Sequence, residues 1–399
     1  MLLHMSRPVE PLADPHAHLS AETLRRGDSI KWRQHPEGVI PLWIADMDFP
    51  VAAPVLDAVR ARLDSAIGYP VSDAPELKAA IARHLARSGL TGLGAGNIAL
   101  TPSVVPGIYA SVNALSAPGD AVVLLTPVYH PFHMAITELG RRPLGVPLLD
   151  TPEGYRVDWE ALEAACAQSR LLLLCHPHNP TGRVWTPEEL ERLRDLAVKY
   201  DLFVMSDELH ADLRYEGRAF ESFAADPRVQ ARTVTVTGPC KAFNTAGLGI
   251  GAMISHDADL VARVRGAAGG LMGHPAALSL TMWQAALDHG QPWLEETVAY
   301  LQGNRDFISN YLREKLPWVR FHPVESTYLA WLDLRAHPRA ADMHAFLLQE
   351  AQVALNDGPM FAPEAQKPLY QGFVRLNFAT SRALLTEALE RMRVALAHP

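Results

Sequence analysis

Short apolar runs alternate with amphipathic stretches through the middle of the chain, and this alternation is its strongest structural signal. Each run has the length of a buried strand and is rich in Val, Leu, Ile and Thr. Six strands are predicted in this way: Ile98–Thr101, Ala121–Thr126, Leu171–Cys175, Leu202–Ser206, Thr233–Thr237 and Gly249–Ile254. Buried strands separated by helices are typical of an α/β domain built on a parallel sheet.

One of the intervening helices has clear end signals. Thr186 suits the N-cap, Pro187 follows at the first helical position, and Glu189 completes a capping box. Apolar side chains then recur at helical spacing up to Tyr200, and Asp201 ends the pattern. The sequence therefore predicts a strand–loop–helix–strand unit, in which ligands bind near the carboxyl ends of the strands.

The two ends of the chain have a different pattern. The N-terminal segment is rich in Pro and His, and the C-terminal part combines a long helical stretch with an alternating run at Thr327–Asp333 and a strand at Gly372–Phe378. These segments predict a second, smaller α+β domain. We expect a large domain over residues 51–290 and a small domain made of residues 1–50 and 291–399.

Composition and charge exclude several classes of protein. Asp and Glu (44) outnumber Lys and Arg (36), which gives a net charge of −8 and no basic patch for nucleic acid. The three cysteines form no CxxC motif, as expected in a reducing cytosol. No segment approaches the roughly 18 apolar residues of a membrane span, and the N-terminus lacks a signal peptide's apolar core. We therefore expect a cytoplasmic protein that binds neither nucleic acid nor membrane.

Polar side chains follow several of the predicted strands. The loop His176–Gly182 contains two prolines and a glycine, and it holds Asn179 where its amide can donate into a cleft. The alternative is that Asn179 only closes a turn. His176 and His178 have no third ligand nearby in the sequence, so no metal site is expected.

A carboxylate and a lysine follow the next two strands. Burying Asp207 is costly unless a cation or hydrogen bonds compensate its charge, and the alternative is that it caps a helix. Lys241 lies in a loop flanked by Gly and Pro, directly before the apolar run Ala246–Ile254. Apolar surroundings favour a neutral amine, which is nucleophilic enough to form a Schiff base.

Three further segments suggest ligand contacts. Arg375 lies inside an apolar strand, where a guanidinium suits a bound carboxylate, although a structural salt bridge is the alternative. The Thr101–Gly107 segment joins a strand to a helix, so its backbone N–H groups can cradle a phosphate. Tyr129 follows another strand and offers an aromatic face to a planar ligand.

Taken together, Asn179, Asp207, Lys241 and Arg375 occur in this order within HNPTG, SDE, a post-strand lysine loop and RLNF. This set resembles the fold-type-I pyridoxal 5′-phosphate (PLP) enzymes of the class I/II aminotransferase superfamily. The resemblance implies an α/β fold whose large domain has a mostly parallel seven-stranded sheet flanked by helices, with a smaller α+β domain beside it.

A narrower resemblance extends over nearly the whole chain. Its motifs are Ser29–Trp32, Pro41–Phe49, Ile67–Tyr69, TPVYHPF, SDELHAD and Ala354–Gly358. They resemble the carbon–sulfur β-lyase branch, which includes bacterial cystathionine β-lyases, cystalysin and the maltose-regulon modulator. His210, where many members of the wider superfamily have Tyr, also agrees with this branch.

The resemblance implies a set of cofactor contacts. In this chain they are Val104, Val105, Tyr129, Asn179, Asp207, His210, Thr237 and Lys241, with Tyr69 reaching the phosphate of the neighbouring subunit in a homodimer.

It also implies particular roles. Lys241 would carry PLP as a Schiff base and move the proton at the substrate Cα, and Asp207 would pair with the pyridine nitrogen. Arg375 and the backbone at Ala45 would hold the α-carboxylate of an amino-acid substrate, with Tyr129 and Asn179 nearby in the substrate site.

Four positions depart from the superfamily pattern. Gly238 and Gly249 stand where a phosphate-binding Ser and Arg are common, and Cys240 stands where Ser is common. His130 replaces a tyrosine found in some of the lyases. We therefore expect weak retention of PLP and a substrate pocket that differs from theirs.

The activity implied by the resemblance is a PLP-dependent C–S β-lyase that cleaves L-cystathionine or a related S-substituted cysteine to a thiol, pyruvate and ammonia. An aminotransferase on the same scaffold is the alternative, because the two reactions differ only in pocket shape and proton delivery. A regulatory protein that binds a transcription factor is a third hypothesis, and the intact set of catalytic residues argues against a purely binding role.

Overall fold

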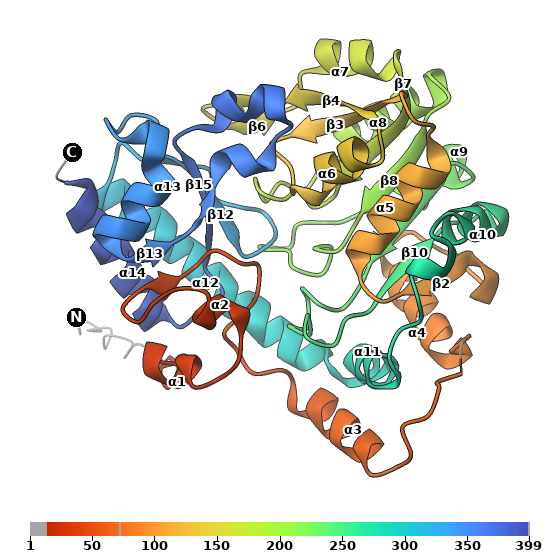
Figure 1. Cartoon of the computed structure of the whole chain (residues 1–399), viewed down its shortest axis with the longest axis horizontal. Helices are drawn as coiled ribbons and strands as arrows, with labels where there is room; N and C mark the ends of the chain where they lie inside the picture. Colours follow the sequence, from red (N-terminus) through yellow and green to blue (C-terminus); the bar gives the residue numbers. More distant parts are fainter. Residues whose placement is uncertain (1–13, 72, 398–399) are drawn as a thin grey trace, which may run out of the picture.

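The computed structural model describes residues 14–71 and 73–397, and its centre is a seven-stranded sheet (Figure 1). Four neighbouring pairs are parallel, whereas β10 runs antiparallel to both of its neighbours. The expected mostly parallel α/β sheet is confirmed. Its strands, in spatial order, are β2 (Ile98–Thr101), β10 (Gly251–Ile254), β9 (Thr233–Thr237), β8 (Phe203–Asp207), β7 (Ser169–Cys175), β3 (Ala121–Thr126) and β4 (Arg142–Pro147).

The six strands predicted from the apolar runs are all present in this sheet. Three agree residue for residue, and β7, β8 and β10 differ by one or two residues at their ends. The apolar runs do not predict β4, an edge strand with proline near both ends and only one buried residue. An edge strand keeps part of its surface exposed, so its apolar signal is weak.

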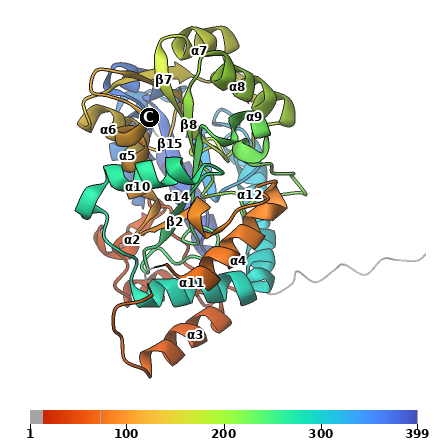
Figure 2. The same ribbon diagram turned by 90° about the vertical axis from the view of Figure 1, so that its right-hand side faces the viewer.

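Helices cover both faces of the sheet, because alternate side chains of each strand point to opposite faces. Leu171 and Leu173 of β7 pack with α5, α6 and α10, whereas Leu172 and Leu174 pack with α7, α8 and α9. Figure 2 shows the sheet between these two helical layers. The helices are α5 (Val104–Leu115), α6 (Pro131–Glu138), α10 (Ala258–Ala267), α7 (Trp159–Cys166), α8 (Pro187–Lys199) and α9 (Pro227–Gln230).

The capping box predicted for α8 is confirmed. The hydroxyl of Thr186 accepts a hydrogen bond from the Glu189 backbone N–H at 3.2 Å, and the Glu189 carboxylate accepts one from the Thr186 N–H at 3.0 Å. The helix thereby satisfies two of its free N-terminal donors with its own side chains.

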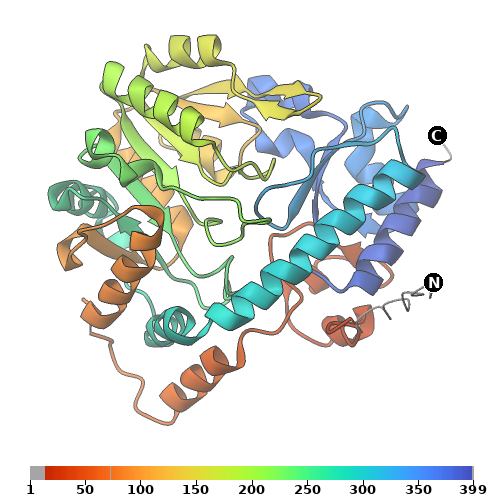
Figure 3. The same ribbon diagram turned by 180° about the vertical axis from the view of Figure 1, so that it is seen from behind.

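The long helix α12 (Gln291–Lys315) leads from the large sheet to a second, four-stranded antiparallel sheet (Figure 3). Two strands predicted in the C-terminal part of the chain, β12 and β15, are the central pair of that sheet. In order, its strands are β11 (Arg320–Phe321), β12 (Leu329–Asp333), β15 (Phe373–Asn377) and β14 (Asn356–Asp357).

The N-terminal part of the described chain packs beside this second sheet. β1 (Ile40–Pro41) pairs in parallel with β13 (Val353–Ala354), so two segments more than 300 positions apart in the sequence are joined. None of the helices in residues 14–71 and 73–397 is long and apolar enough to cross a membrane. The remaining elements are α1 (Ala21–Arg25), α2 (Ile30–Arg33), α3 (Ala53–Leu63), α4 (Pro75–Leu85), α11 (Ala277–His289), α13 (Met343–Phe346), α14 (Arg382–Leu396), β5 (Leu149–Thr151) and β6 (Gly154–Arg156).

Candidate active site

A cavity of about 570 Å³ opens where the strands of the large sheet end. Its wall is made by segments that follow β1, β2, β3, β7, β8 and β9, and it is closed on one side by β15. Parallel strands present their carboxyl ends at one edge, which brings these segments together. Nine of the expected cofactor and substrate contacts line this cavity: Ala45, Val104, Val105, Tyr129, Asn179, Asp207, His210, Lys241 and Arg375.

Arg375 is a buried cation whose hydrogen-bond partners are all neutral. Its guanidinium donates to Asn179 Oδ1 at 3.0 Å, to Asn356 Oδ1 at 2.5 Å and to the Trp43 carbonyl at 3.2 Å. Its Nε has no partner, and burial lowers the pKa of Arg375 to about 10. The described residues provide no carboxylate for it, so the salt-bridge alternative is wrong and the site has room for an anionic ligand.

Asn179 is oriented by that arginine. Because its Oδ1 accepts from Arg375, its side-chain N–H groups remain available to the cavity. The Asn179 carbonyl accepts from the Tyr129 backbone N–H at 3.1 Å, which ties together the loops after β7 and β3. Because the side-chain amide of Asn179 is hydrogen-bonded to Arg375 of the four-stranded sheet, Asn179 does more than close a local turn.

Asp207 is the last residue of β8 and is 5% exposed. One of its oxygens accepts from the Leu209 backbone N–H at 3.1 Å. Burial raises the pKa of Asp207 to about 7, although that hydrogen bond and the charge of Lys241 act in the opposite direction. No helix begins here, so the capping alternative is wrong, and a cation in the cavity would stabilise the carboxylate.

Lys241 reaches across the cavity to the segment that follows β1. Its ammonium donates to the Ala45 carbonyl at 2.6 Å, and the hydroxyl of Tyr328 donates to the same oxygen at 3.0 Å. Tyr328 is fully buried. One backbone oxygen therefore positions the lysine, through a contact between residues 196 positions apart.

The two histidines of the cavity are neutral at pH 7. Burial, together with the charges of Lys241 and Arg375, lowers the pKa of His210 to about 3. Burial and the charge of Arg375 also lower the pKa of His130 to about 4. The positive charge facing the cavity is thus carried by Lys241 and Arg375.

At one end of the cavity, the backbone at Gly249 and Gly251 lies so close to the segment after β2 that it leaves no room for side chains. A Cβ atom on Gly249 would lie 2.6 Å from the Pro102 carbonyl oxygen, and one on Gly251 would lie 3.1 Å from the Val104 nitrogen. The N-terminus of α5, at Val104 and Val105, faces this end. Helix N-terminal N–H groups bind phosphate, so this end fits a phosphate held by backbone. The weak retention expected from the missing Ser and Arg stays a prediction.

Two residues from the sequence analysis lie elsewhere. Thr237 does not line this cavity: its hydroxyl donates to the Glu208 carbonyl at 3.5 Å and it borders a different cavity, so the expected cofactor contact of Thr237 is not supported. The end of β9 directs this side chain away from the active-site wall. Tyr69 is fully exposed in the described chain and contacts no part of this cavity.

Three further residues at the cavity or its wall had no predicted role in the sequence. Ser103 precedes α5 and lines the cavity, and its hydroxyl makes no capping bond. Asn356 holds Arg375, and Tyr328 shares the Ala45 carbonyl with Lys241. Ser103 and Asn356 lie inside motifs that were already noted, whereas Tyr328 had only its place in an alternating run.

The two histidines of the His176–Gly182 loop are engaged within the protein. His176 Nε2 lies 3.1 Å from the Glu221 carbonyl, and His178 Nδ1 lies 2.8 Å from the Thr181 hydroxyl. Across the part of the chain that the structure describes, no group of three or more His, Cys, Asp or Glu is arranged to hold a metal ion.

These features fit a phosphorylated pyridine aldehyde. Asp207 is a buried carboxylate that lacks a cationic partner, Lys241 supplies an amine, Asn179 offers free N–H donors, and α5 offers a phosphate cradle. Arg375, on the other side of the cavity, has only neutral hydrogen-bond partners. It therefore suits the carboxylate of a molecule bound beside the aldehyde.

Comparison with known proteins agrees with this geometry. Cystathionine beta-lyase PatB of Bacillus subtilis (strain 168) is 34% identical over 383 residues, which cover 92% of this chain and 96% of PatB. The crystal structure of cystalysin from Treponema denticola, which contains a pyridoxal 5′-phosphate cofactor, has a TM-score of 0.87 at 29% identity and covers 94% of this chain and 97% of cystalysin. The PLP-bound C–S lyase from Staphylococcus hominis has a TM-score of 0.86 at 28% identity, covering 93% and 96% of the two chains.

The family model described as "Aminotransferase class I and II" matches residues 37–392. This match includes every residue that lines the cavity apart from Ile30. The chain therefore belongs to the aminotransferase class I and II family.

Proposed function

We propose that this protein is a PLP-dependent carbon–sulfur β-lyase that cleaves L-cystathionine or a related S-substituted cysteine to a thiol, pyruvate and ammonia. The observation that carries the proposal is the meeting of Asp207, Lys241 and Arg375 in one cavity, where Arg375 has no counter-charge. The names of PatB and of the Staphylococcus hominis enzyme support lyase chemistry. An aminotransferase is the weaker alternative.

Four residues are proposed to hold the cofactor. Lys241 would hold PLP covalently, Asp207 would pair with its ring nitrogen, and Asn179 would donate to its ring oxygen, while the N-terminus of α5 would bind its phosphate. Tyr129 lies beside Asn179 and would face the ring. When bound, PLP supplies an electron-withdrawing ring that stabilises negative charge at the substrate Cα.

The other residues are proposed to bind and deprotonate the substrate. Arg375 would form a bidentate pair with the α-carboxylate next to the backbone at Ala45, which fixes the position of the Cα–H bond. The Lys241 amine, positioned by the Ala45 carbonyl, would take the Cα proton as general base. The ionised Asp207 would stay buried and exclude water from the ring nitrogen.

Two features of organisation belong to the same proposal. A homodimer would bring Tyr69 of each chain to the neighbouring active site, which agrees with an aromatic side chain left fully exposed in one chain. The division into a large domain (51–290) and a small domain (1–50 and 291–399) is supported by the two separate sheets and by the pairing of β1 with β13.

Purified, PLP-loaded protein given L-cystathionine without any keto acid is expected to release pyruvate and a free thiol in equal amounts. A β-elimination needs no amino-group acceptor, whereas transamination does. The measurement follows pyruvate with lactate dehydrogenase and thiol with a chromogenic disulfide in one sample. Absence of both products, with amino-group transfer once 2-oxoglutarate is added, would replace the lyase proposal by the aminotransferase.

Asp207→Asn is expected to stabilise the cofactor-free protein at pH 8 while it lowers turnover of the loaded enzyme. The folded-state pKa of Asp207, about 7, lies above its ordinary 3.8, so the folded state holds a proton that the unfolded state releases between these values. Folding stability therefore falls as pH rises through this window, and Asn avoids the loss. The gap in unfolding free energy between variant and wild type should widen by on the order of 2 kcal/mol from pH 5 to pH 8.

Thermal unfolding of both cofactor-free proteins at the two pH values measures this gap. Glu208, whose pKa is also raised to about 7 by burial, is present in both proteins, so only the smaller part of this rise that comes from the charge of Asp207 differs between them. A variant that is less stable than wild type at pH 8, or a gap that does not change with pH, would show that Asp207 is not the costly buried carboxyl described above.

A further inference from the structure

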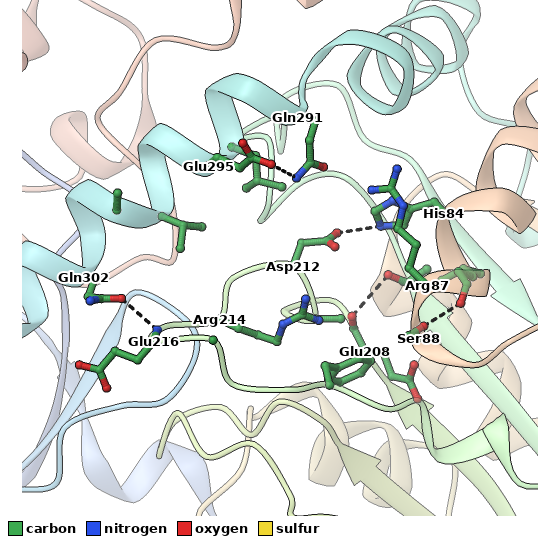
Figure 4. Close-up of a pocket in the computed structure, with 18 residues that line it drawn as sticks. His84, Arg87, Ser88, Glu208, Asp212, Arg214, Glu216, Gln291, Glu295 and Gln302 are labelled. Carbon is green, nitrogen blue, oxygen red and sulfur yellow. Dashed lines mark hydrogen bonds and ion pairs between the residues drawn. The ribbon is translucent and has the colours of Figure 1, made fainter.

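A second cavity, of about 470 Å³, lies on the other side of the loop that follows β8 (Figure 4). It is bounded by α4 and the turn after it, by this loop and by α12. The loop is shared between the two cavities: Asp207 and His210 line the first, whereas Glu208, Asp212 and Arg214 line the second. The proposed active site and the second cavity are therefore back to back.

Most carboxylates around the second cavity already have partners inside the protein. Figure 4 shows these contacts as dashed lines for Asp212 and Glu295, which come from the loop and from α12. The contacts are Asp212 with His84 at 3.1 Å, Glu216 with Arg305 at 2.8 Å, and Glu295 with Gln291 at 2.9 Å.

The two arginines that line the cavity are different. Within residues 14–71 and 73–397, the guanidinium groups of Arg87 and Arg214 have no hydrogen-bond or ion-pair partner, and Arg214 lies 5.6 Å above the ring of Phe220. Arg214 is half-buried, and burial lowers its pKa, whereas Arg87 is exposed at the mouth of the cavity. The two arginines also influence the carboxylate of Asp212. Burial raises the pKa of Asp212, but the His84 hydrogen bond and the charges of His84, Arg214 and Arg87 outweigh burial and hold this pKa below its ordinary value.

The opposite wall contains an apolar strip. Leu294 and Val298 of α12 and Leu85 of α4 form this apolar strip, beside the polar side chains of Gln291, Glu295 and Gln302 from the same α12, so a ligand held by the arginines can also contact hydrocarbon. The carboxylates nearby disfavour a multiply charged anion such as phosphate, because each added negative charge is repelled. A single carboxylate meets less of this repulsion and can still pair with two guanidinium groups.

A buried hydrogen-bond acceptor in the loop after β8 also lacks a donor. Glu208 is 2% exposed, and its Oε1 accepts from the hydroxyls of Ser206 and Ser222 at 2.9 Å each, whereas its Oε2 has no partner. Buried polar atoms are nearly always paired in proteins. The loop after β8 therefore offers both a half-buried cation, Arg214, and a buried acceptor, Glu208 Oε2, that have no partner among the described residues.

From these observations we infer that the second cavity binds a small monocarboxylate with a short apolar tail, whose head lies between Arg87 and Arg214 and whose tail lies along Leu294 and Val298. The inference goes beyond the lyase reaction and does not require it. Two sources share this chemistry, a simple aliphatic acid and an apolar α-amino acid, and the latter would also offer an ammonium group to Glu208.

The test is calorimetric titration of the PLP-loaded protein with hexanoate, with L-norleucine, which has the same tail plus an ammonium group, and with inorganic phosphate. Hexanoate is expected to bind at millimolar concentration or better, and Arg214→Gln is expected to weaken it at least about tenfold. Arg218→Gln is the matched control: Arg218 is four positions away, pairs with Glu325 and does not line this cavity. Only the part of the norleucine binding that Arg214→Gln weakens is compared, because an amino acid also suits the active site: if this part is tighter than hexanoate binding, the amino acid is the ligand, and if it is equal or weaker, the simple acid is.

A third variant separates this cavity from the active site, because carboxylates also suit Arg375. In Arg375→Lys the hexanoate site that depends on Arg214 is expected to remain. Hexanoate binding that is lost in Arg375→Lys and kept in Arg214→Gln would overturn the inference, and so would an absence of hexanoate binding in the wild-type protein. Phosphate binding as tight as that of hexanoate would overturn the assignment to a monocarboxylate. Since each readout is binding, failure here would leave the test of pyruvate release unaffected.

Discussion

Lys241→Ala is expected to lower the rate of pyruvate release from L-cystathionine by on the order of 10³-fold or more. The lysine is proposed both to hold the cofactor and to take the substrate Cα proton, and its ammonium is bound to the Ala45 carbonyl at 2.6 Å inside the cavity. In the described chain no second lysine lines this cavity, so no neighbouring amine can replace it.

The measurement is the steady-state rate at saturating PLP, together with retention of the cofactor absorbance after borohydride reduction and denaturation. Wild type is expected to keep the absorbance covalently, and Lys241→Ala is expected to lose it. Lys199→Ala is the control, because Lys199 is exposed on α8 and pairs with Glu163. A Lys241→Ala variant that retains the wild-type rate would refute the proposed catalytic role, whereas partial recovery with added methylamine would identify the missing amine.

Arg375→Ala is expected to raise KM for the amino-acid substrate about 100-fold or more, with a smaller effect on kcat. The proposed carboxylate contact is charge-assisted and buried, and such hydrogen bonds are worth roughly 1.5–3 kcal/mol each. The guanidinium also holds Asn179 and Asn356, so alanine removes more than the substrate contact. Arg375→Lys keeps the charge but loses the planar fork, and we expect KM to rise about 10-fold.

Arg335→Lys is the control for both Arg375 variants, because Arg335 forms an ion pair with Asp333 outside the cavity. Steady-state kinetics for the three variants, with circular dichroism to confirm folding, give the KM and kcat changes separately. An unchanged KM in a folded Arg375→Ala variant would remove the arginine from the substrate site. A fall in kcat alone would instead assign it to positioning Asn179.

Much of the large domain is predictable because its signals are local. A nearly continuous apolar run predicts β3 to the residue, and a run of β-branched Thr and Val predicts β9 to the residue, because both side-chain types suit a buried strand. The capping box of α8 is equally local, because its donors and acceptors are three positions apart. β4 lacks such a signal, because an edge strand with one buried residue needs no apolar run.

The candidate site was predictable only in part. Asn179, Asp207 and Lys241 follow buried strands, and the parallel sheet brings strand ends to one edge, so their meeting follows from the pattern. The family resemblance, rather than spacing, supplied Ala45 and Tyr69. The resemblance also implied a cofactor contact for Thr237, which borders the other cavity instead, because the direction of a side chain at a strand end depends on the loop that follows.

By itself, the sequence determined the α/β class, most of the strands of the large sheet and the polar residues at their ends, because these depend on burial patterns a few residues long. The tertiary structure decided what those residues contact. Only packing of the two sheets brings Arg375 onto Asn179, 196 positions away, without a carboxylate between them. Only the fold of the loop after β8 turns Asp207 toward one cavity and Arg214 toward another. Contacts between distant segments depend on strand order and sheet packing, which no local pattern encodes.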